Sequence, residues 1–244
     1  MKAKGAFTAH GHAYLFGFIA KSVIDEFGKD GVNAVAEGVI KYGRQRGRRM
    51  AQRTLADGFK LTALNYVAYG EWFAEPGDMD SSIPSKKPDL EFLIKKCPWH
   101  DVWTENSLLE KYGYLYCKYV DVAIGEGYNP KIQFDIVACR GLGDSVCDMR
   151  MRNAKATDKD ERALSERISK LGNKAKMPWD YHCGHLFKAL WEVVTARFGS
   201  GGLAVMQKAL GQFNSVYGEE AGDALLRLMD VDYNVAPAYV GIDA

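Results

Sequence analysis

The chain has 244 residues, 47% of them hydrophobic, which suits one large domain with ample apolar surface for a core. Its 32 basic and 31 acidic side chains nearly cancel, so no nucleic-acid partner is expected, and no apolar run approaches the ~20 residues that span a bilayer. Five cysteines without an even framework exclude a disulfide-stapled secreted scaffold and predict a cytoplasmic protein.

Apolar residues spaced three and four apart predict an amphipathic helix over residues 9–28, ending at Gly28, and a second helix over about 32–57. A third helix is expected over about 59–73. Residues 75–88 contain three prolines and little apolar content, which indicates a loop or an internal boundary.

The central part of the chain carries the predicted strands. A strand over 89–97 is followed by a short helix over about 102–112. Residues 114–124 are ambiguous, but a stripe of residues at helical spacing favours a helix there. The clearest strands cover 131–139 and 145–152, with five residues between them. The rest of the chain predicts helices over about 158–171, 180–198, 202–217 and 219–229.

An apolar pattern in the first two helices recurs 171 positions later, where Phe27-Gly28 and Gly31 correspond to Phe198-Gly199 and Gly202. Either the chain contains a duplication, or two helix–glycine–helix hairpins have converged on one pattern. The elements together predict an α+β fold, in which a small antiparallel sheet is flanked by N-terminal and C-terminal helical hairpins. We expect one domain over 1–244, with N-terminal helices (1–74), a mixed core with a cysteine hairpin (75–155) and C-terminal helices (156–244).

Two cysteines stand eight positions apart in the segment C-R-G-L-G-D-S-V-C. With the turn centred on Gly143, Cys139 lies opposite Cys147, Val137 opposite Met149 and Asp135 opposite Met151. Directly opposed residues have Cβ atoms ~4.5–5.5 Å apart, a separation that suits two thiolates sharing a zinc ion. Cys117, with Asp121 or a water molecule, would complete the set of ligands, whereas small buried thiols or one reactive thiolate are the alternatives.

A second group of reactive side chains is the segment C-P-W-H-D at 97–101. Cys97 and His100 are candidates for a nucleophile and its base, or His100 alone for a general base towards water. An ordinary strand-to-helix turn is the alternative. The histidine pairs His10/His12 and His182/His185 begin similar helices and are expected to be solvated or capping groups.

The segment at 41–53 contains six basic residues and no acidic one. A solvated helix face is the default interpretation, because no aromatic stacking motif accompanies the basic residues. One of the arginines could instead bind a substrate carboxylate through paired hydrogen bonds.

Several short motifs in order, among them I-K-Y-G-R-Q-R-G, K-C-P-W, Y-C-K-Y-V-D, G-Y-N-P and G-D-S-V-C-D-M-R-M, resemble the L-2-amino-thiazoline-4-carboxylic acid hydrolase family. The resemblance covers about residues 10–230 and implies hydrolytic opening of a small heterocycle to an N-carbamoyl amino acid. The cysteine segment is also similar to vinyl-reductase-type ligand-binding domains. That similarity implies zinc ligands at Cys139 and Cys147, with Cys117 as an earlier one, whereas Asp135 lies one position from the expected acidic ligand.

We therefore expect a hydrolase that acts on C–N or C–S bonds of a small ring, by attack of activated water or of a cysteine. The predicted catalytic residues are Cys97, His100 and Asp121, with zinc at the three cysteines and no organic cofactor. The alternative is a non-catalytic sensor or carrier with a structural zinc site. A small-molecule substrate is the expected partner, and a homo-oligomer is left open. Aromatic residues are predicted to line the substrate pocket, namely Tyr14, Phe18, Trp99, Trp103 and Tyr116.

Overall fold

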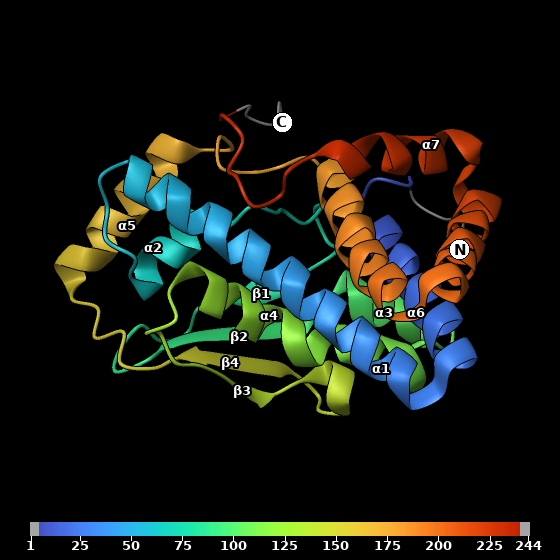
Figure 1. The fold of residues 1–244 in the computed structure, drawn as a ribbon. Helices are drawn as coiled ribbons and strands as arrows, with labels where there is room; N and C mark the ends of the chain where they lie inside the picture. The colour runs from blue at the N-terminus through green and yellow to red at the C-terminus, as the bar shows by residue number, and fades with distance from the viewer. Residues whose placement is uncertain (1–4, 240–244) are drawn as a thin grey trace. The chain divides into compact units, whose positions relative to one another are not determined.

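The computed structural model describes residues 5–239 and confirms the α+β class (Figure 1). None of the described helices combines the length and apolar character that a bilayer crossing requires. In chain order the elements are α1 (Ala9–Ala56), α2 (Ala63–Ala68), β1 (Asp80–Ser82), β2 (Leu90–Lys96), α3 (Pro98–Glu105), a π-helical turn (Leu109–Gly113), α4 (Tyr114–Tyr128), β3 (Phe134–Ala138), a 3-10 turn (Arg140–Leu142), β4 (Cys147–Met151), α5 (Asp158–Leu171), α6 (Trp179–Tyr217), α7 (Glu219–Arg227) and a second 3-10 turn (Leu228–Asp230).

The chain divides into two compact units, each assembled from three segments of the sequence. The first unit comprises the residues up to Tyr42, Cys97–Val120 and Pro178–Val231. The second comprises Gly43–Lys96, Asp121–Met177 and the residues from Asp232 onward. The expected single domain with three consecutive parts stays a prediction.

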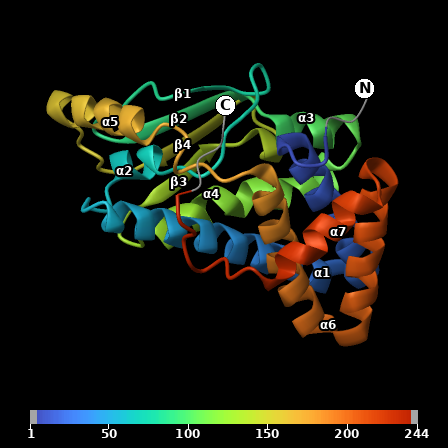
Figure 2. The same ribbon diagram turned by 90° about the horizontal axis from the view of Figure 1, so that it is seen from above.

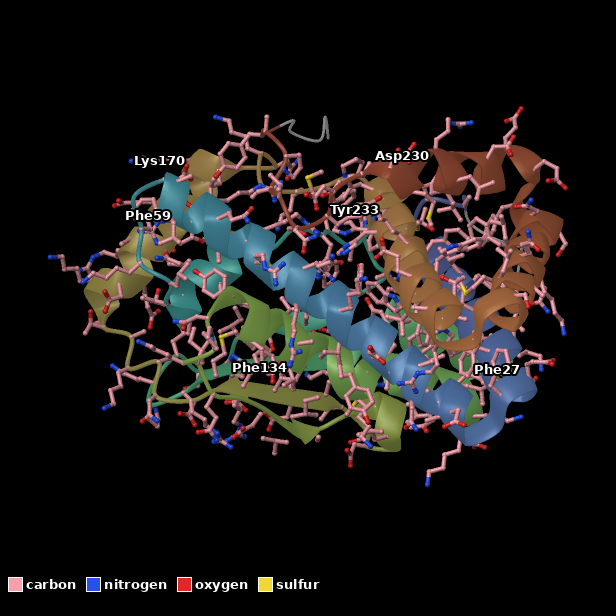
Figure 3. The ribbon with its side chains drawn as sticks, in the orientation of Figure 1. Phe27, Phe59, Phe134, Lys170, Asp230 and Tyr233 are labelled. Atoms are coloured by element: carbon pink, nitrogen blue, oxygen red, sulfur yellow. The ribbon has the colours of Figure 1, made fainter. Side chains whose placement is uncertain are left out.

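The first unit is built on two helical hairpins with the same bend. Gly28 in α1 has φ 55° and ψ −126°, and Gly199 in α6 has φ 56° and ψ −129°. A positive φ of this kind favours glycine. The hairpins pack with Phe27 stacked on Phe198, their ring centroids 3.8 Å apart and their planes 5° from parallel; Figure 3 labels Phe27 at the bend. The two helices expected on either side of each glycine form one long element with a kink at that glycine. The pattern that recurs after 171 residues therefore corresponds to the same backbone bend in α1 and α6.

The second unit contains a four-stranded antiparallel sheet with the order β1-β2-β4-β3. The predicted pairing of Val137 with Met149 and of Asp135 with Met151 is wrong. Ile136 pairs with Met149 and Asp135 with Arg150, because the register shifts between Ile136 and Ala138. Such a bulge cannot be derived from alternation alone, because it adds one residue to one strand.

Other element boundaries also differ from the prediction. The helix expected at 59–73 is the short α2, capped by the Thr62 side chain, and β1 lies inside the expected loop at 75–88. The helix expected at 102–112 begins earlier, at Pro98, a residue suited to the first helical turn. The ambiguous segment at 114–124 is confirmed as helix, and α5 has the predicted bounds, with a capping box between Thr157 and Asp160.

Two glycines allow α1 and α4 to touch backbone to backbone within the second unit. A Cβ atom on Gly47 would lie 2.1 Å from the Ile124 carbonyl oxygen, and one on Gly127 would lie 2.2 Å from the Arg44 carbonyl oxygen. No larger residue fits such a contact. The crossing places Arg46, next to Gly47 on α1, close enough to Asp121 of α4 to influence the titration of its carboxyl group.

A buried ion-pair network fixes the C-terminal part of α1 in the second unit. The Arg49 guanidinium donates from Nε and Nη2 to the two carboxylate oxygens of Glu71, at 3.0 and 2.6 Å. Arg53 donates to the same carboxylate at 2.8 Å. Arg49 also donates to the Tyr233 carbonyl oxygen at 2.7 Å, so the network ties α1 to the segment after α2 and to the C-terminal segment (Tyr233 is labelled in Figure 3).

Candidate functional site

The second unit contains a cavity of about 670 Å³. Its walls come from the C-terminal part of α1, from α2, α4 and α5, and from one face of the sheet, elements that lie side by side in both ribbon views (Figures 1 and 2). A pocket of this size falls within the range of ligand-binding sites, ~300–1,000 Å³. The apolar lining residues are Met50, Val67, Trp72, Met79, Ile83, Phe92, Ile94, Ile124, Phe134, Met149, Leu164 and Ile168.

Four charged groups border this cavity, three of them basic and one acidic. Lys86 forms an ion pair with Glu161 at 3.0 Å. The other three are Arg46, Asp121 and Lys176. Arg46 is a buried member of the basic segment at 41–53, and its charge acts on Asp121, Lys176 and the Tyr66 hydroxyl. A guanidinium in an apolar pocket is suited to bind a carboxylate bidentately.

Asp121 is the candidate base of the cavity. Burial raises the pKa of its carboxyl group to about 6, against the lowering effect of the Arg46 charge. No residue in the described part of the chain donates a hydrogen bond to this carboxylate, although its side chain borders the cavity. A carboxylate with a pKa near neutrality is ionised at pH 7 and still basic enough to take a proton from water.

Lys176 supplies an amino group on the same cavity. Burial lowers the pKa of this amine, and the charge of Arg46 lowers it further. Its Nζ donates a hydrogen bond to the Gly70 carbonyl oxygen at 2.7 Å, which holds the group at the wall of the cavity. An ammonium group with a lowered pKa is a stronger acid than an exposed lysine, so Lys176 can donate a proton as well as stabilise negative charge.

Cys139 and Cys147 belong to the second unit, although neither lines this cavity. Cys147 pairs with Ile94, so its side chain projects from the sheet face that also carries Met149 and lines the cavity. Its sulfur accepts a hydrogen bond from the Arg140 amide at 3.4 Å. The hydrogen bond between its thiol and Cys139, followed by burial, raises the pKa of Cys147 well above its usual range. A neutral, hydrogen-bonded thiol is a weak nucleophile, which argues against direct attack by Cys147.

The predicted zinc ligands come from both units. Cys117 belongs to the first unit, whereas Cys139, Cys147 and Asp121 belong to the second. Within residues 5–239, no three His, Cys, Asp or Glu side chains are grouped closely enough to hold a metal ion. Zinc therefore stays a prediction that metal analysis would test.

The predicted nucleophile and base at 97–101 lie in the first unit, at the start of α3. Cys97 precedes the helix in extended backbone, with φ −149° and ψ 125°. His100 Nδ1 lies 3.5 Å from the Asp101 carboxylate. Neither residue lines the cavity of the second unit, and their catalytic role stays a prediction.

The predicted pocket aromatics also lie in the first unit rather than around this cavity. Trp99, Trp103 and Tyr116 are buried, while Tyr14 and Phe18 are half-buried and pack on each other. Trp103 donates to the Ala13 carbonyl oxygen at 2.8 Å. Their side chains thus contribute to the packed interior of the first unit.

His12 stands at the centre of this aromatic group and is fully buried. The Trp99 indole donates to its Nδ1 at 3.0 Å, and its Nε2 lies 3.1 Å from the Tyr42 hydroxyl. Because an indole N–H only donates, Nδ1 is unprotonated and Nε2 carries the hydrogen that Tyr42 accepts. The ring is therefore neutral in this arrangement, contrary to the solvated or capping role expected for His12.

Sequence reasoning missed several polar residues of the cavity, among them Lys176 and Tyr66. Lys176 sits in a lysine-rich loop after α5, and nothing in its neighbourhood distinguishes it from exposed lysines. Arg46 was included only as one of several arginines of the basic segment. Its position next to Gly47 is the available signal, since a glycine inside a helix often marks a close backbone contact.

Residues 9–151 match the model of a family described as L-2-amino-thiazoline-4-carboxylic acid hydrolase. The match includes Arg46 and Asp121 but ends before Lys176. The match says nothing about vinyl-reductase-type domains, so the similarity of the cysteine segment to those domains stays a prediction. No curated protein and no solved structure matches the chain significantly.

Proposed function

Since the chain belongs to the L-2-amino-thiazoline-4-carboxylic acid hydrolase family, we propose that it hydrolyses a small heterocyclic carboxylate in the cavity of the second unit. The observation that carries the proposal is that the Asp121 carboxyl group and the buried guanidinium of Arg46 line the same cavity, where burial raises the pKa of Asp121 to about 6. A carboxylate-binding cation and a general base thus border one apolar cavity, as hydrolysis of a ring acid requires.

In the proposed reaction, Arg46 binds the carboxylate of the substrate and orients the ring. Asp121 takes a proton from water while the water oxygen bonds to the ring carbon that lies between sulfur and nitrogen. The C–S bond then breaks, and the sulfur leaves as a thiolate that receives a proton from Lys176. One water molecule is consumed, and the product is an N-carbamoyl amino acid with a free thiol.

The test measures two products from 2-amino-thiazoline-4-carboxylate. Release of one thiol per turnover indicates C–S cleavage, whereas release of ammonia indicates cleavage at the exocyclic nitrogen. We expect Asp121→Asn to lower kcat/KM by about 10²–10⁴-fold, the usual contribution of a general base. Because the base must be ionised, kcat/KM of the wild type should fall tenfold per pH unit below about pH 6.

Glu126→Gln is the matched control, because Glu126 is an exposed carboxylate on the same helix, paired with Arg44 at 2.9 Å. It should leave kcat/KM unchanged. Equal loss in both variants, or full activity of Asp121→Asn, would contradict the assignment of Asp121. Tight binding of the ring acid without any product would instead favour the sensor or carrier alternative, and substitution of Cys97 or His100 tests their predicted catalytic roles.

A further inference from the structure

The cavity is far larger than the ring acid after which the family is named. A thiazoline carboxylate has about nine non-hydrogen atoms, and at roughly 30 Å³ each, the share of a water molecule in the liquid, it fills at most about 270 Å³. The cavity measures about 670 Å³. More than half of the space is therefore left for another part of the ligand.

The surplus space is bordered by apolar side chains from elements other than those that carry Arg46 and Asp121. Leu164 and Ile168 come from α5, and Ile83 follows β1. In both ribbon views α2 lies between α5 and α4 (Figures 1 and 2), so α5 and α4 contribute different parts of the lining.

The exposure of the lining residues shows where the cavity opens. Ser81, Ser82 and Ser165 are exposed, and Ile168 retains 44% of its accessible surface. Arg46, by contrast, is only 5% exposed. A ligand whose carboxylate reaches Arg46 therefore extends along the apolar wall towards the opening between β1 and α5.

The deep part of the apolar wall is closely packed. Phe134 and Met149 belong to the buried cluster of the sheet, where Phe92 and Phe134 lie nearly parallel with ring centroids 6.3 Å apart (Phe134 is labelled in Figure 3). Phe134 also packs on Gly125 of α4, at 3.1 Å from the position of a Cβ atom. The sheet face thus cannot collapse onto a small ligand to fill the remaining volume.

We propose that the physiological substrate is a heterocyclic carboxylate bearing a bulky apolar substituent, such as an aryl or branched alkyl group, that occupies the α5 side of the cavity. The inference rests on the proposed function for the ring and its carboxylate, and adds the class of substituent. Each methylene group buried on binding contributes about 0.8 kcal/mol, which corresponds to about fourfold in affinity or kcat/KM.

The test compares 2-amino-thiazoline-4-carboxylate with its 5-methyl, 5-butyl and 5-benzyl derivatives, using the full chain. Product release gives kcat/KM, and calorimetry gives Kd. We expect kcat/KM to rise through the series, with the benzyl compound at least tenfold above the parent ring. Ser165→Trp narrows the opening, and Ile168→Asp makes the wall of the opening polar. In both variants the ratio of kcat/KM for the benzyl compound to kcat/KM for the parent ring should fall to near one.

The outcomes separate this inference from the proposed function. If the parent ring is hydrolysed as well as the benzyl compound, the inference is overturned and the hydrolase assignment stands. If no compound is hydrolysed but the benzyl acid binds more tightly than the parent, and Arg46→Met abolishes that binding, the hydrolase assignment fails and the ligand class stands. If the parent ring is hydrolysed but the substituted acids neither bind nor react, only the inference is overturned. If no compound of the series binds or reacts, both are overturned.

Discussion

The two units bury polar groups in different ways. In the first unit, His12 is enclosed by aromatic rings, and both of its nitrogens have fixed partners in Trp99 and Tyr42. In the second unit, Asp121 and Lys176 border a cavity, and burial shifts the pKa values of both groups towards neutrality.

This contrast separates a structural polar group from a functional one. A buried polar group whose hydrogen bonds are all made within the protein contributes to a unique packed interior. A charged group at the wall of a cavity, with a pKa that burial shifts towards neutrality, is a candidate for a functional group. We therefore propose a structural role for the His12 cluster and a chemical role for the cavity.

The largest expected effect on stability concerns the buried ion-pair network of the second unit, in which charged groups are paired with one another. Glu71→Gln leaves the guanidinium groups of Arg49 and Arg53 buried beside a neutral amide. Removing one partner of a buried pair costs about 3–5 kcal/mol of unfolding free energy. Urea denaturation monitored by circular dichroism measures the loss.

Glu126→Gln provides the comparison, because its partner Arg44 is 55% exposed and surface pairs contribute about 0–1 kcal/mol. If Glu71→Gln were as stable as Glu126→Gln, the network would not hold the second unit together. A charged residue of that unit could then not be classed as structural on the ground that it forms an ion pair within the protein.

The next prediction addresses the first unit. His12→Phe keeps an aromatic ring but leaves the Trp99 indole and the Tyr42 hydroxyl buried without the histidine nitrogens. Each of the two buried hydrogen bonds that is lost costs about 1–2 kcal/mol, so we expect a total loss of about 2–4 kcal/mol. The kcat/KM of the folded fraction should stay at the wild-type value.

A fall in kcat/KM larger than the loss of folded protein would contradict a purely structural role of His12, because it would show that the first unit contributes to catalysis. His12→Asn, which can still offer one donor and one acceptor, should recover part of the stability. Active-site titration, or activity normalised to the folded fraction, makes the distinction.

The sequence predicted the fold better than the site. The helical stripe through Asp121, the strands at 89–97 and 145–152 and the bounds of α5 follow from local periodicity, and the structure confirms them. The antiparallel hairpin was also predicted, but its bulge at Ile136/Ala138 was not, because nothing in the alternation of the strands specifies an extra residue.

The cavity could not be derived in the same way. Its four charged residues are 35 or more positions apart along the chain and come together only through tertiary packing. Cysteine and histidine drew attention because they are rare and reactive, whereas Arg46 and Lys176 belong to the commonest charged types. Asp121 was identified through its spacing from Cys117, and the structure gives it a different setting, on a cavity opposite Arg46.

A smaller effect is expected from Arg46→Met, which keeps the length of the side chain and removes its charge. Loss of a charge-assisted contact to the substrate carboxylate should lower kcat/KM by about 10–100-fold, or about 1.5–3 kcal/mol, mainly through KM. A carboxamide analogue of the substrate should be processed equally by the variant and the wild type. Steady-state kinetics on the two compounds measures the difference.

Arg48→Met is the matched control on the same helix, because Arg48 is exposed and donates to the Asn234 side chain at 2.6 Å. Its kinetics should equal those of the wild type. A loss with Arg46→Met that is just as large on the carboxamide would mean that Arg46 acts through Asp121 rather than on the substrate.

The smallest expected effect is a gain in unfolding free energy, whereas the other predictions are losses of stability or activity. The folded-state pKa of Asp121 is raised from 3.8 to about 6, so between these values the folded protein binds more protons than the unfolded chain. Unfolding free energy therefore falls as pH rises through this window, and the ionised carboxylate destabilises the protein at pH 7. Asp121→Asn removes this cost and should be more stable at pH 7 by on the order of 1 kcal/mol, allowing for partial solvent screening.

The gain should shrink as pH is lowered from 6 towards 4, because the wild-type carboxyl group then becomes neutral like the amide. Thermal unfolding of both proteins across that range measures the trend, with Glu126→Gln as the reference. A variant that is both inactive and more stable at neutral pH identifies a residue kept for chemistry at the expense of stability. A variant that is less stable at every pH would place Asp121 with His12 among the groups that hold the fold.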